Sequence, residues 1–180
     1  IAGTTAYTYF GTPGDVRFGQ VATETRPAPG GSGTITGVFE YNDALGRLTK
    51  KAYGADITEY FYDSSSVSFG RGKLTGVEHR EGGYIVQRKM GYDIFGNQTS
   101  LVTDIAHSTE TLCADTQALP CHAVNTQTYD SFGRLQESTY ADTKVSRIDY
   151  VFGRNAVTGI RHDGQVYASY SGYGETGQPG

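Results

Sequence analysis

The chain has 180 residues and a formal charge of −4, and it contains 25 glycines, 14 tyrosines, one methionine and no tryptophan. This composition is typical of strands joined by tight turns and disfavours a helical bundle. The acidic balance provides no basic field for a phosphate backbone, so we expect no nucleic-acid partner. No apolar run approaches the roughly 20 residues of a membrane helix, so we expect no membrane insertion either.

Residues 1–34 are predicted to form an atypical first unit that ends in a loop. The opening "IAGTTAYTYF" lacks the basic start and apolar stretch of a secretory signal, while "RPAPGGSG" at 26–33 has the composition of a loop. Because the chain begins without methionine, we expect it to be a piece of a longer protein.

From residue 35 onward a short motif repeats. A hairpin corner is predicted at each copy, because aspartate is favoured at the first position of a type I turn and glycine at the fourth. A type I turn followed by a left-handed glycine is a common three-residue hairpin loop. The predicted corners are Asp43/Gly46, Asp93/Gly96 and Asp130/Gly133. The copies are "YNDALGRL" at 41–48, "YDIFGN" at 92–97, "YDSFGRL" at 129–135 and "DYVFGRN" at 149–155, with a spaced variant, "FYDSSSVSFGRGKL", at 61–74.

Between successive corners the chain has a second kind of reversal, flanked by segments in which residues alternate in character. The reversals are "YGAD" at 53–56, "EGG" at 81–83, "ADT" at 141–143 and "DG" at 163–164. Alternation such as that in "VSRIDYVF" has the two-residue period of a strand. The expected fold is therefore all-β: an antiparallel meander of repeated hairpins in a curved or spiralling sheet, with repeats over 35–103 and 129–180 in one domain.

Residues 104–128 are predicted to be an inserted loop that rejoins the sheet near Tyr129. This segment carries Cys113 and Cys121, eight residues apart, with Pro120 and several turn-forming residues between them. A local disulfide is the first expectation for such a pair. Two free thiols are an alternative. So is a metal site that includes His107 and His122, although the spacing matches no CxxC pattern.

The motif copies closely resemble the tyrosine-aspartate (YD) repeats of the Rhs family, which also occur in the B and C components of Tc toxins and in teneurins. The resemblance covers roughly residues 35 to 180 well and 5 to 25 weakly. It implies a β-sheet ribbon that spirals into a hollow shell. In bacterial members this shell encloses a toxic C-terminal segment, and in teneurins it forms an extracellular barrel used in adhesion.

Two copies depart from the repeat. Asn42 stands where the repeat has its tyrosine, and in "DYVFGRN" the tyrosine and aspartate are exchanged, so looser corners are expected there. The chain also stops before any region that resembles the site of self-cleavage in bacterial members. No cleavage residue is therefore transferred.

No catalytic residue, metal or cofactor is expected. The motif aspartates are explained by their turns, and the histidines at 79, 107, 122 and 162 form no recognisable triad order. Arg47, Arg134 and Arg154 follow the turn glycine, with Asn97 in the same position. These side chains are predicted to bond turn carbonyls or the aspartate of a neighbouring unit.

The sequence thus favours a non-enzymatic shell segment whose partner is the remainder of its own polypeptide, including an enclosed C-terminal toxin. Such a protein would be secreted or at the cell surface. The alternative is an extracellular binding or adhesion module, in which the tyrosines or residues 104–128 recognise a glycan or a cell-surface protein.

Overall fold

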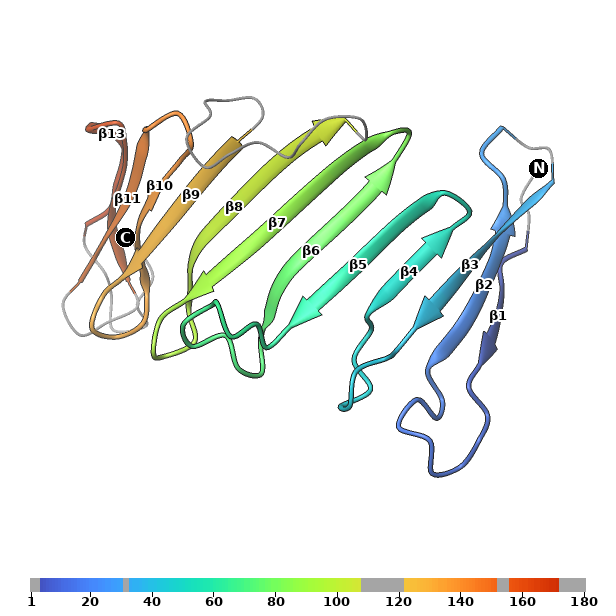
Figure 1. The fold of residues 1–180 in the computed structure, drawn as a ribbon. Coiled ribbons are helices and arrows are strands. Elements are labelled where there is room, and N and C mark those ends of the chain that lie inside the picture. Colours follow the sequence, from blue (N-terminus) through green and yellow to red (C-terminus); the bar gives the residue numbers. More distant parts are fainter. Residues whose placement is uncertain (1–3, 31–32, 108–121, 152–155, 172–180) are drawn as a thin grey trace.

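A computed structural model describes residues 4–30, 33–107, 122–151 and 156–171. These residues form one sheet of 13 strands in which each strand pairs only with its neighbours in the sequence (Figure 1). Every pairing is antiparallel, and no helix occurs in the described ranges, which confirms the predicted all-β meander. The strands are β1 (Ala6–Tyr9), β2 (Val21–Pro27), β3 (Thr34–Glu40), β4 (Lys50–Tyr53), β5 (Asp56–Tyr62), β6 (Leu74–Glu81), β7 (Tyr84–Tyr92), β8 (Gln98–His107), β9 (His122–Tyr129), β10 (Leu135–Thr139), β11 (Val145–Tyr150), β12 (Val157–His162) and β13 (Gln165–Ser169).

The sheet is a single layer that does not close on itself. Strands β1 and β13 are its two edges, and Figure 1 shows a twisted ribbon of strands without a second layer packed against it. Among the described residues the only buried hydrophobic side chains are Ala106 and Ala156. The fold therefore depends on strand pairing and on cross-strand side-chain contacts rather than on a core between two layers.

The connections fall into two sets at opposite ends of the strands. The predicted corners join β3 to β4, β5 to β6, β7 to β8 and β9 to β10, at the lower end of the ribbon in Figure 1. The other reversals join β4 to β5, β6 to β7, β10 to β11 and β12 to β13, at the upper end. We call these two ends the corner end and the reversal end.

The sheet extends further into the predicted insertion than the sequence indicated. Strand β8 continues to His107, β9 begins at His122, and the pairing between them reaches Asp104 and His122. Residues 104–107 and 122–128 thus belong to strands rather than to a loop, and the sheet includes His122, well before Tyr129, because Asp104 and His122 are direct cross-strand partners. Cys113 and Cys121 lie outside the described residues.

Strand β2 likewise extends into the segment that was predicted to be a loop at 26–33. Arg26 and Pro27 pair with Ile35 and Thr34 of β3. Within the described part of the chain, no helix is long and apolar enough to cross a membrane.

Candidate functional site at the repeated corner

The corner at 130–134 is a three-residue hairpin loop that is closed by two backbone hydrogen bonds. The Gly133 N–H donates to the Asp130 carbonyl at 2.9 Å, and the Asp130 N–H donates to the Arg134 carbonyl at 3.0 Å. The corner at 93–97 has the same two bonds, each at 3.0 Å. At 43–46 the Gly46 N–H donates to the Asp43 carbonyl at 2.9 Å. The next backbone bond across this corner is from the Thr49 N–H to the Glu40 carbonyl, at 2.8 Å, so the loop is longer than in the other two corners.

Each corner glycine adopts a backbone conformation that disfavours other residues. The φ angle is +68° at Gly46, +85° at Gly96 and +75° at Gly133. This left-handed region brings the Cβ of an L-residue too close to the following carbonyl, and a β-branched side chain is disfavoured most. Glycine is therefore the residue that this backbone conformation favours.

The aspartate side chain organises the interior of each corner. One carboxylate oxygen accepts the N–H two residues ahead: Leu45 to Asp43 at 2.7 Å, Phe95 to Asp93 at 2.9 Å and Phe132 to Asp130 at 2.9 Å. In the two regular corners the same oxygen also accepts the N–H four residues ahead, from Asn97 at 2.9 Å and Arg134 at 3.0 Å. The carboxylate thus satisfies backbone donors that the turn leaves unpaired.

The residue after the glycine binds the other oxygen of the aspartate. Arg134 Nε lies 2.7 Å from Asp130 Oδ2, Arg47 Nη2 lies 2.7 Å from Asp43 Oδ2, and Asn97 Nδ2 lies 2.9 Å from Asp93 Oδ2. Two of these side chains also reach the next unit. Arg47 pairs with Asp63, and Arg134 Nη1 lies 3.5 Å from the Val151 carbonyl. Arg154 lies outside the described residues.

The spaced copy at 61–74 keeps the ends of the corner and adds residues between them. The Asp63 N–H donates to the Lys73 carbonyl at 3.1 Å, as Asp130 does to Arg134, and Asp63 Oδ1 accepts the Gly72 N–H. The added residues form further turns, with Val67 bonded to Ser64, and Gly70 to Val67, each at 3.1 Å. An expanded loop is therefore accommodated without loss of the strand pairing on either side.

The motif tyrosines form a series of hydrogen bonds from one unit to the preceding one. Each hydroxyl donates to the backbone carbonyl two residues after the preceding motif glycine. The bonds are Tyr62 to Leu48 at 2.9 Å, Tyr92 to Leu74 at 2.6 Å, Tyr129 to Gln98 at 2.8 Å and Tyr150 to Leu135 at 2.9 Å. We call these four bonds the tyrosine ties.

The sequence analysis identified the tyrosines as part of the repeated motif but did not predict these bonds. The constant position of the acceptor, two residues after each motif glycine, was a usable signal. It acquires meaning only when the register between units is known. The tyrosine ties were therefore missed.

Three of the four tied tyrosines also lie beneath a cation of the preceding unit. The Arg47 guanidinium carbon lies 4.2 Å from the Tyr62 ring centroid, Lys73 Nζ 5.8 Å from that of Tyr92, and the Arg134 carbon 4.3 Å from that of Tyr150. Such cation–π contacts contribute about 0.5–1 kcal/mol at exposed sites. The exception is Tyr129, because the residue after the preceding glycine is the neutral Asn97.

A β-bulge lies beside each of these tyrosines. The pairing register shifts between Phe61 and Tyr62, between Gly91 and Tyr92, and between Asp149 and Tyr150, and between Leu135 and Glu137 on the strand opposite Tyr129. Bulges raise the local twist and re-aim side chains. The bulge thus belongs to the repeating unit, together with the turn and the tie.

The hydrogen bonds of the corner determine how its carboxylates and phenols titrate. Bonds from Arg47 hold the pKa of Asp43 at about 2, and bonds from Arg134 lower the pKa of Asp130. For Asp93, burial raises the pKa, but bonds from Asn97 and from backbone N–H groups outweigh it. Burial raises the pKa of Tyr62, Tyr92 and Tyr129. The corners therefore carry ionised aspartates and neutral phenols at neutral pH.

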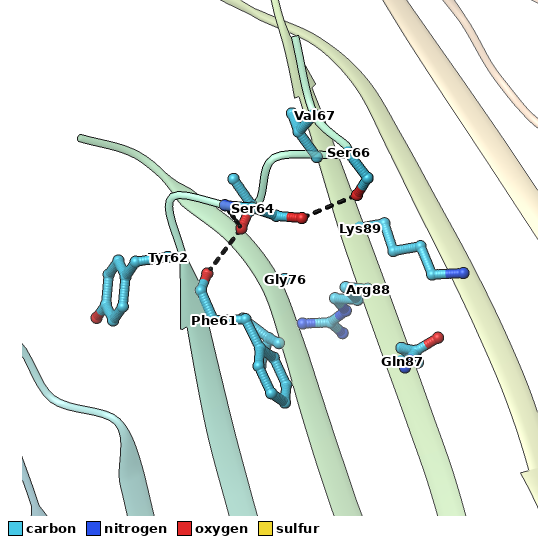
Figure 2. A pocket seen from close by; sticks show the side chains of 11 residues that line it. Phe61, Tyr62, Ser64, Ser66, Val67, Gly76, Gln87, Arg88 and Lys89 are labelled. Carbon is cyan, nitrogen blue, oxygen red and sulfur yellow. Dashed lines mark hydrogen bonds between the residues drawn. The ribbon is translucent and has the colours of Figure 1, made fainter. Parts of the chain in front are cut away.

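The expanded corner covers a hollow of about 360 Å³ on one face of β5, β6 and β7 (Figure 2). Phe61, Gln87 and Lys89 line it from the strands, and Ser64 and Ser66 line it from the loop, with their hydroxyl oxygens 2.8 Å apart. Of the described residues that line it, none is a histidine or a carboxylate. The lining therefore lacks the histidine and the carboxylate of a Ser-His-Asp arrangement.

The most buried polar contact joins β8 to β9 where these strands approach the 108–121 segment. Asp104 is 2% exposed and His122 is 8% exposed, and Asp104 Oδ1 lies 2.6 Å from His122 Nδ1. Lys89 Nζ lies 3.8 Å from the other oxygen of Asp104. Because Asp104 and His122 are cross-strand partners, this buried hydrogen bond joins β8 to β9.

The described residues contain no group of three or more histidine, cysteine, aspartate or glutamate side chains that could hold a metal ion. The metal alternative that includes Cys113 and Cys121 lies outside these residues. His122 is the histidine of that alternative that directly follows Cys121 in the sequence, and its Nδ1 lies within hydrogen-bond distance of Asp104.

Comparison with known proteins finds similarity to solved structures only. No family model matches the chain, and no curated protein matches it. A chain in the solved structure of the Photorhabdus luminescens Tc holotoxin pore is similar, at 16% identity and a TM-score of 0.41. The match covers 97% of this chain and 11% of that chain, so the present chain spans about a ninth of its length.

Proposed function

We propose that the chain is a non-enzymatic wall segment of an Rhs-type β-shell that encloses a C-terminal toxin or effector of the same polypeptide. The observation that carries the proposal is the set of four tyrosine ties, which bond each unit to the one before it. A device that joins every unit to its predecessor can extend over any number of units.

The single-layer sheet supports a role as part of a larger body. In the part of the chain that the structure describes, β1 and β13 each have one unpaired edge, which natural proteins usually cover or continue. Large apolar side chains such as Phe95 and Tyr167 are 87% and 75% exposed. A wall whose neighbouring strands come from the remainder of the polypeptide would satisfy the edges and cover part of these surfaces.

The motif residues support containment rather than catalysis. Each motif aspartate is occupied by backbone N–H groups and by the side chain that follows the glycine. A carboxylate held in this way at low pKa is a poor proton donor or acceptor at neutral pH. The proposed partner is therefore the rest of the chain's own polypeptide, in a secreted or cell-surface protein.

The test uses the full-length polypeptide that contains this chain. Electron microscopy of the purified protein is expected to show a closed hollow particle, and limited proteolysis is expected to leave the C-terminal segment intact. Combined Tyr92→Phe and Tyr129→Phe substitutions, which remove two adjacent ties, should open the wall and expose that segment to protease. An extended particle, or a C-terminal segment that is cleaved equally in both proteins, would refute the proposal.

A further inference from the structure

A shallow hollow of about 510 Å³ lies at the reversal end, away from the corners and the tyrosine ties. It is lined by Asn125, Tyr140, Ala141, Asp142, Lys144 and His162, which come from β9, from the reversal at 140–144 and from β12. Three elements distant in sequence thus contribute polar side chains to one surface. None of these residues has a role in the repeated corner.

The rings of Tyr140 and His162 line this hollow, and Tyr167 packs edge-on against His162 without lining the hollow itself. The centroids of Tyr140 and His162 lie 6.4 Å apart, and those of His162 and Tyr167 lie 6.1 Å apart with the ring planes at 87°. Tyr140 is 44% exposed and Tyr167 is 75% exposed. The rings are therefore positioned by one another while their outer surfaces remain open to a ligand.

The polar groups of the hollow are balanced in charge. Lys144 Nζ lies 3.7 Å from Asp142 Oδ2, so the pair contributes no net charge. Asn125 Oδ1 accepts the Ala141 N–H at 3.1 Å, and His162 Nδ1 lies 2.8 Å from Ser146 Oγ. These bonds orient the amide and the imidazole, and within the described ranges no hydrogen bond occupies Asn125 Nδ2 or His162 Nε2.

The backbone beside the hollow is strained. Thr143 has a φ of +67°, although it is β-branched and the corners place glycine at the equivalent position. Strained residues of this kind cluster at binding sites, where the surrounding structure holds them in place. The strain and the open rings are independent observations at the same hairpin tip.

We propose that this hollow binds a neutral saccharide. A pyranose ring has an apolar C–H face that stacks on an aromatic ring and a rim of hydroxyls that bond amide, imidazole and carboxylate groups. The balanced Asp142–Lys144 pair disfavours a charged ligand, and the polar lining disfavours a lipid. The inference is independent of the shell proposal, because it concerns only side chains on the surface of the sheet.

The test is a glycan array probed with the chain, followed by titration of the best neutral hit in solution with saturation-transfer NMR. Tyr140→Ala removes the exposed ring that lines the hollow and should weaken binding at least tenfold, and Asn125→Ala should weaken it several-fold. The control is Tyr9→Ala, a tyrosine of similar exposure at 58% on β1, which should bind as the parent does. Circular dichroism of each variant shows whether the sheet is retained.

Three results would overturn the proposal. They are the absence of any neutral saccharide among the hits, hits confined to anionic glycans, and equal binding by the parent and by Tyr140→Ala. None of them bears on the shell, which is tested by particle shape and by protease protection.

Discussion

The corner at 130–134 and the reversal at 140–144 join the strand β10 to its two neighbours with the same backbone hydrogen bonds. In the reversal the Thr143 N–H donates to the Tyr140 carbonyl and the Tyr140 N–H donates to the Lys144 carbonyl, each at 2.9 Å. The corner has glycine at the left-handed position and an aspartate at its first position. The reversal has threonine and tyrosine there.

The difference separates what the turn geometry requires from what the repeat requires. Both turns form, so neither the aspartate nor the glycine is essential to the backbone path. In the corner, Asp130 forms an ion pair with Arg134. The same arginine lies over the ring of Tyr150, which belongs to the next unit. We infer that the corner sequence recurs because it links units, whereas the reversal sequence is free to vary.

The largest expected effect is the loss of a corner glycine. A Cβ on Gly46 would lie 2.8 Å from the Val16 carbonyl oxygen, so Gly46→Val combines backbone strain with a steric clash and should lower the free energy of unfolding by about 3 kcal/mol. A Cβ on Gly133 meets nothing within 4 Å, so Gly133→Val should cost about 2 kcal/mol from strain alone. Urea denaturation followed by circular dichroism measures both.

These two variants test whether the positive φ angle of the corner position makes glycine more stable there than a β-branched residue. The matched substitution Thr143→Val keeps a β-branched residue at the reversal and should change the stability little. If Gly133→Val were as stable as the parent, the corner assignment would be wrong.

The next effect is the loss of the corner ion pairs in acid. The pKa of Asp43 is lowered from 3.8 to about 2 in the folded chain, mainly by Arg47. A depressed folded pKa gives stability that is present above the unfolded value and is lost as the pH falls through the folded value. The corner contribution should therefore disappear between about pH 4 and pH 2. In the reversal at 140–144 the first position, which the corner fills with aspartate, is Tyr140, so no carboxylate titrates at that position.

The measurement is the urea midpoint as a function of pH. Asp43→Ala should be less stable than the parent at pH 7, and the difference should shrink below pH 4. The control, Gly133→Ala, strains a corner without removing a carboxylate, so its difference from the parent should stay constant. If the urea midpoint of Asp43→Ala ran parallel to that of the parent from pH 7 to pH 2, the ion pair would not be the source of the pH dependence.

A smaller effect, of opposite sign, is expected at the reversal. Thr143→Gly relieves the strain of a β-branched residue at a φ of +67° but increases the entropy of the unfolded chain. The net gain in the free energy of unfolding should be about 0.5–1 kcal/mol. Thermal unfolding would register it as a higher midpoint, and an unchanged or lower midpoint would show that Thr143 is not strained.

The smallest effect is expected where a cation is missing between units. Asn97→Arg would place an arginine beside Asp93 and over Tyr129, the arrangement that Arg134 has with Asp130 and Tyr150. The expected gain is about 0.5 kcal/mol, which is typical of an exposed cation–π contact. Asn97→Lys is the matched comparison and should gain less, because lysine cannot make the bidentate contact. A loss of stability in both would show that the neutral unit is optimised in another way.

The sequence predicted the corners because their determinants are local. Asp130 and Gly133 fix a turn with bonds that span at most four residues, and alternation fixes the strands beside it. The ion pair from Asp130 to Arg134 is local in the same sense, but the sequence predicted turn carbonyls or a neighbouring unit's aspartate as the partner of the arginine and not the aspartate of its own corner. All of these features require knowledge of a few adjacent residues only.

The features that escaped prediction depend on the register between units. The carbonyl of Gln98 accepts from Tyr129 because β7, β8 and β9 lie in a particular alignment, which no single motif encodes. Asp104 and His122 were assigned to an inserted loop because nothing in the sequence shows that they are cross-strand partners. The strain at Thr143 escaped for the opposite reason, because threonine is a poor indicator of a left-handed turn.

The most direct test of the account is a comparison of Tyr→Phe substitutions that each remove one hydroxyl. Tyr62, Tyr92, Tyr129 and Tyr150 each donate to the preceding unit, whereas the Tyr140 hydroxyl has no hydrogen bond within the described residues. Each of the four variants should lower the free energy of unfolding by about 1 kcal/mol, and Tyr140→Phe should leave it unchanged. If the four variants were as stable as the parent, or if Tyr140→Phe cost as much as they do, the tyrosine ties would not be what joins the units.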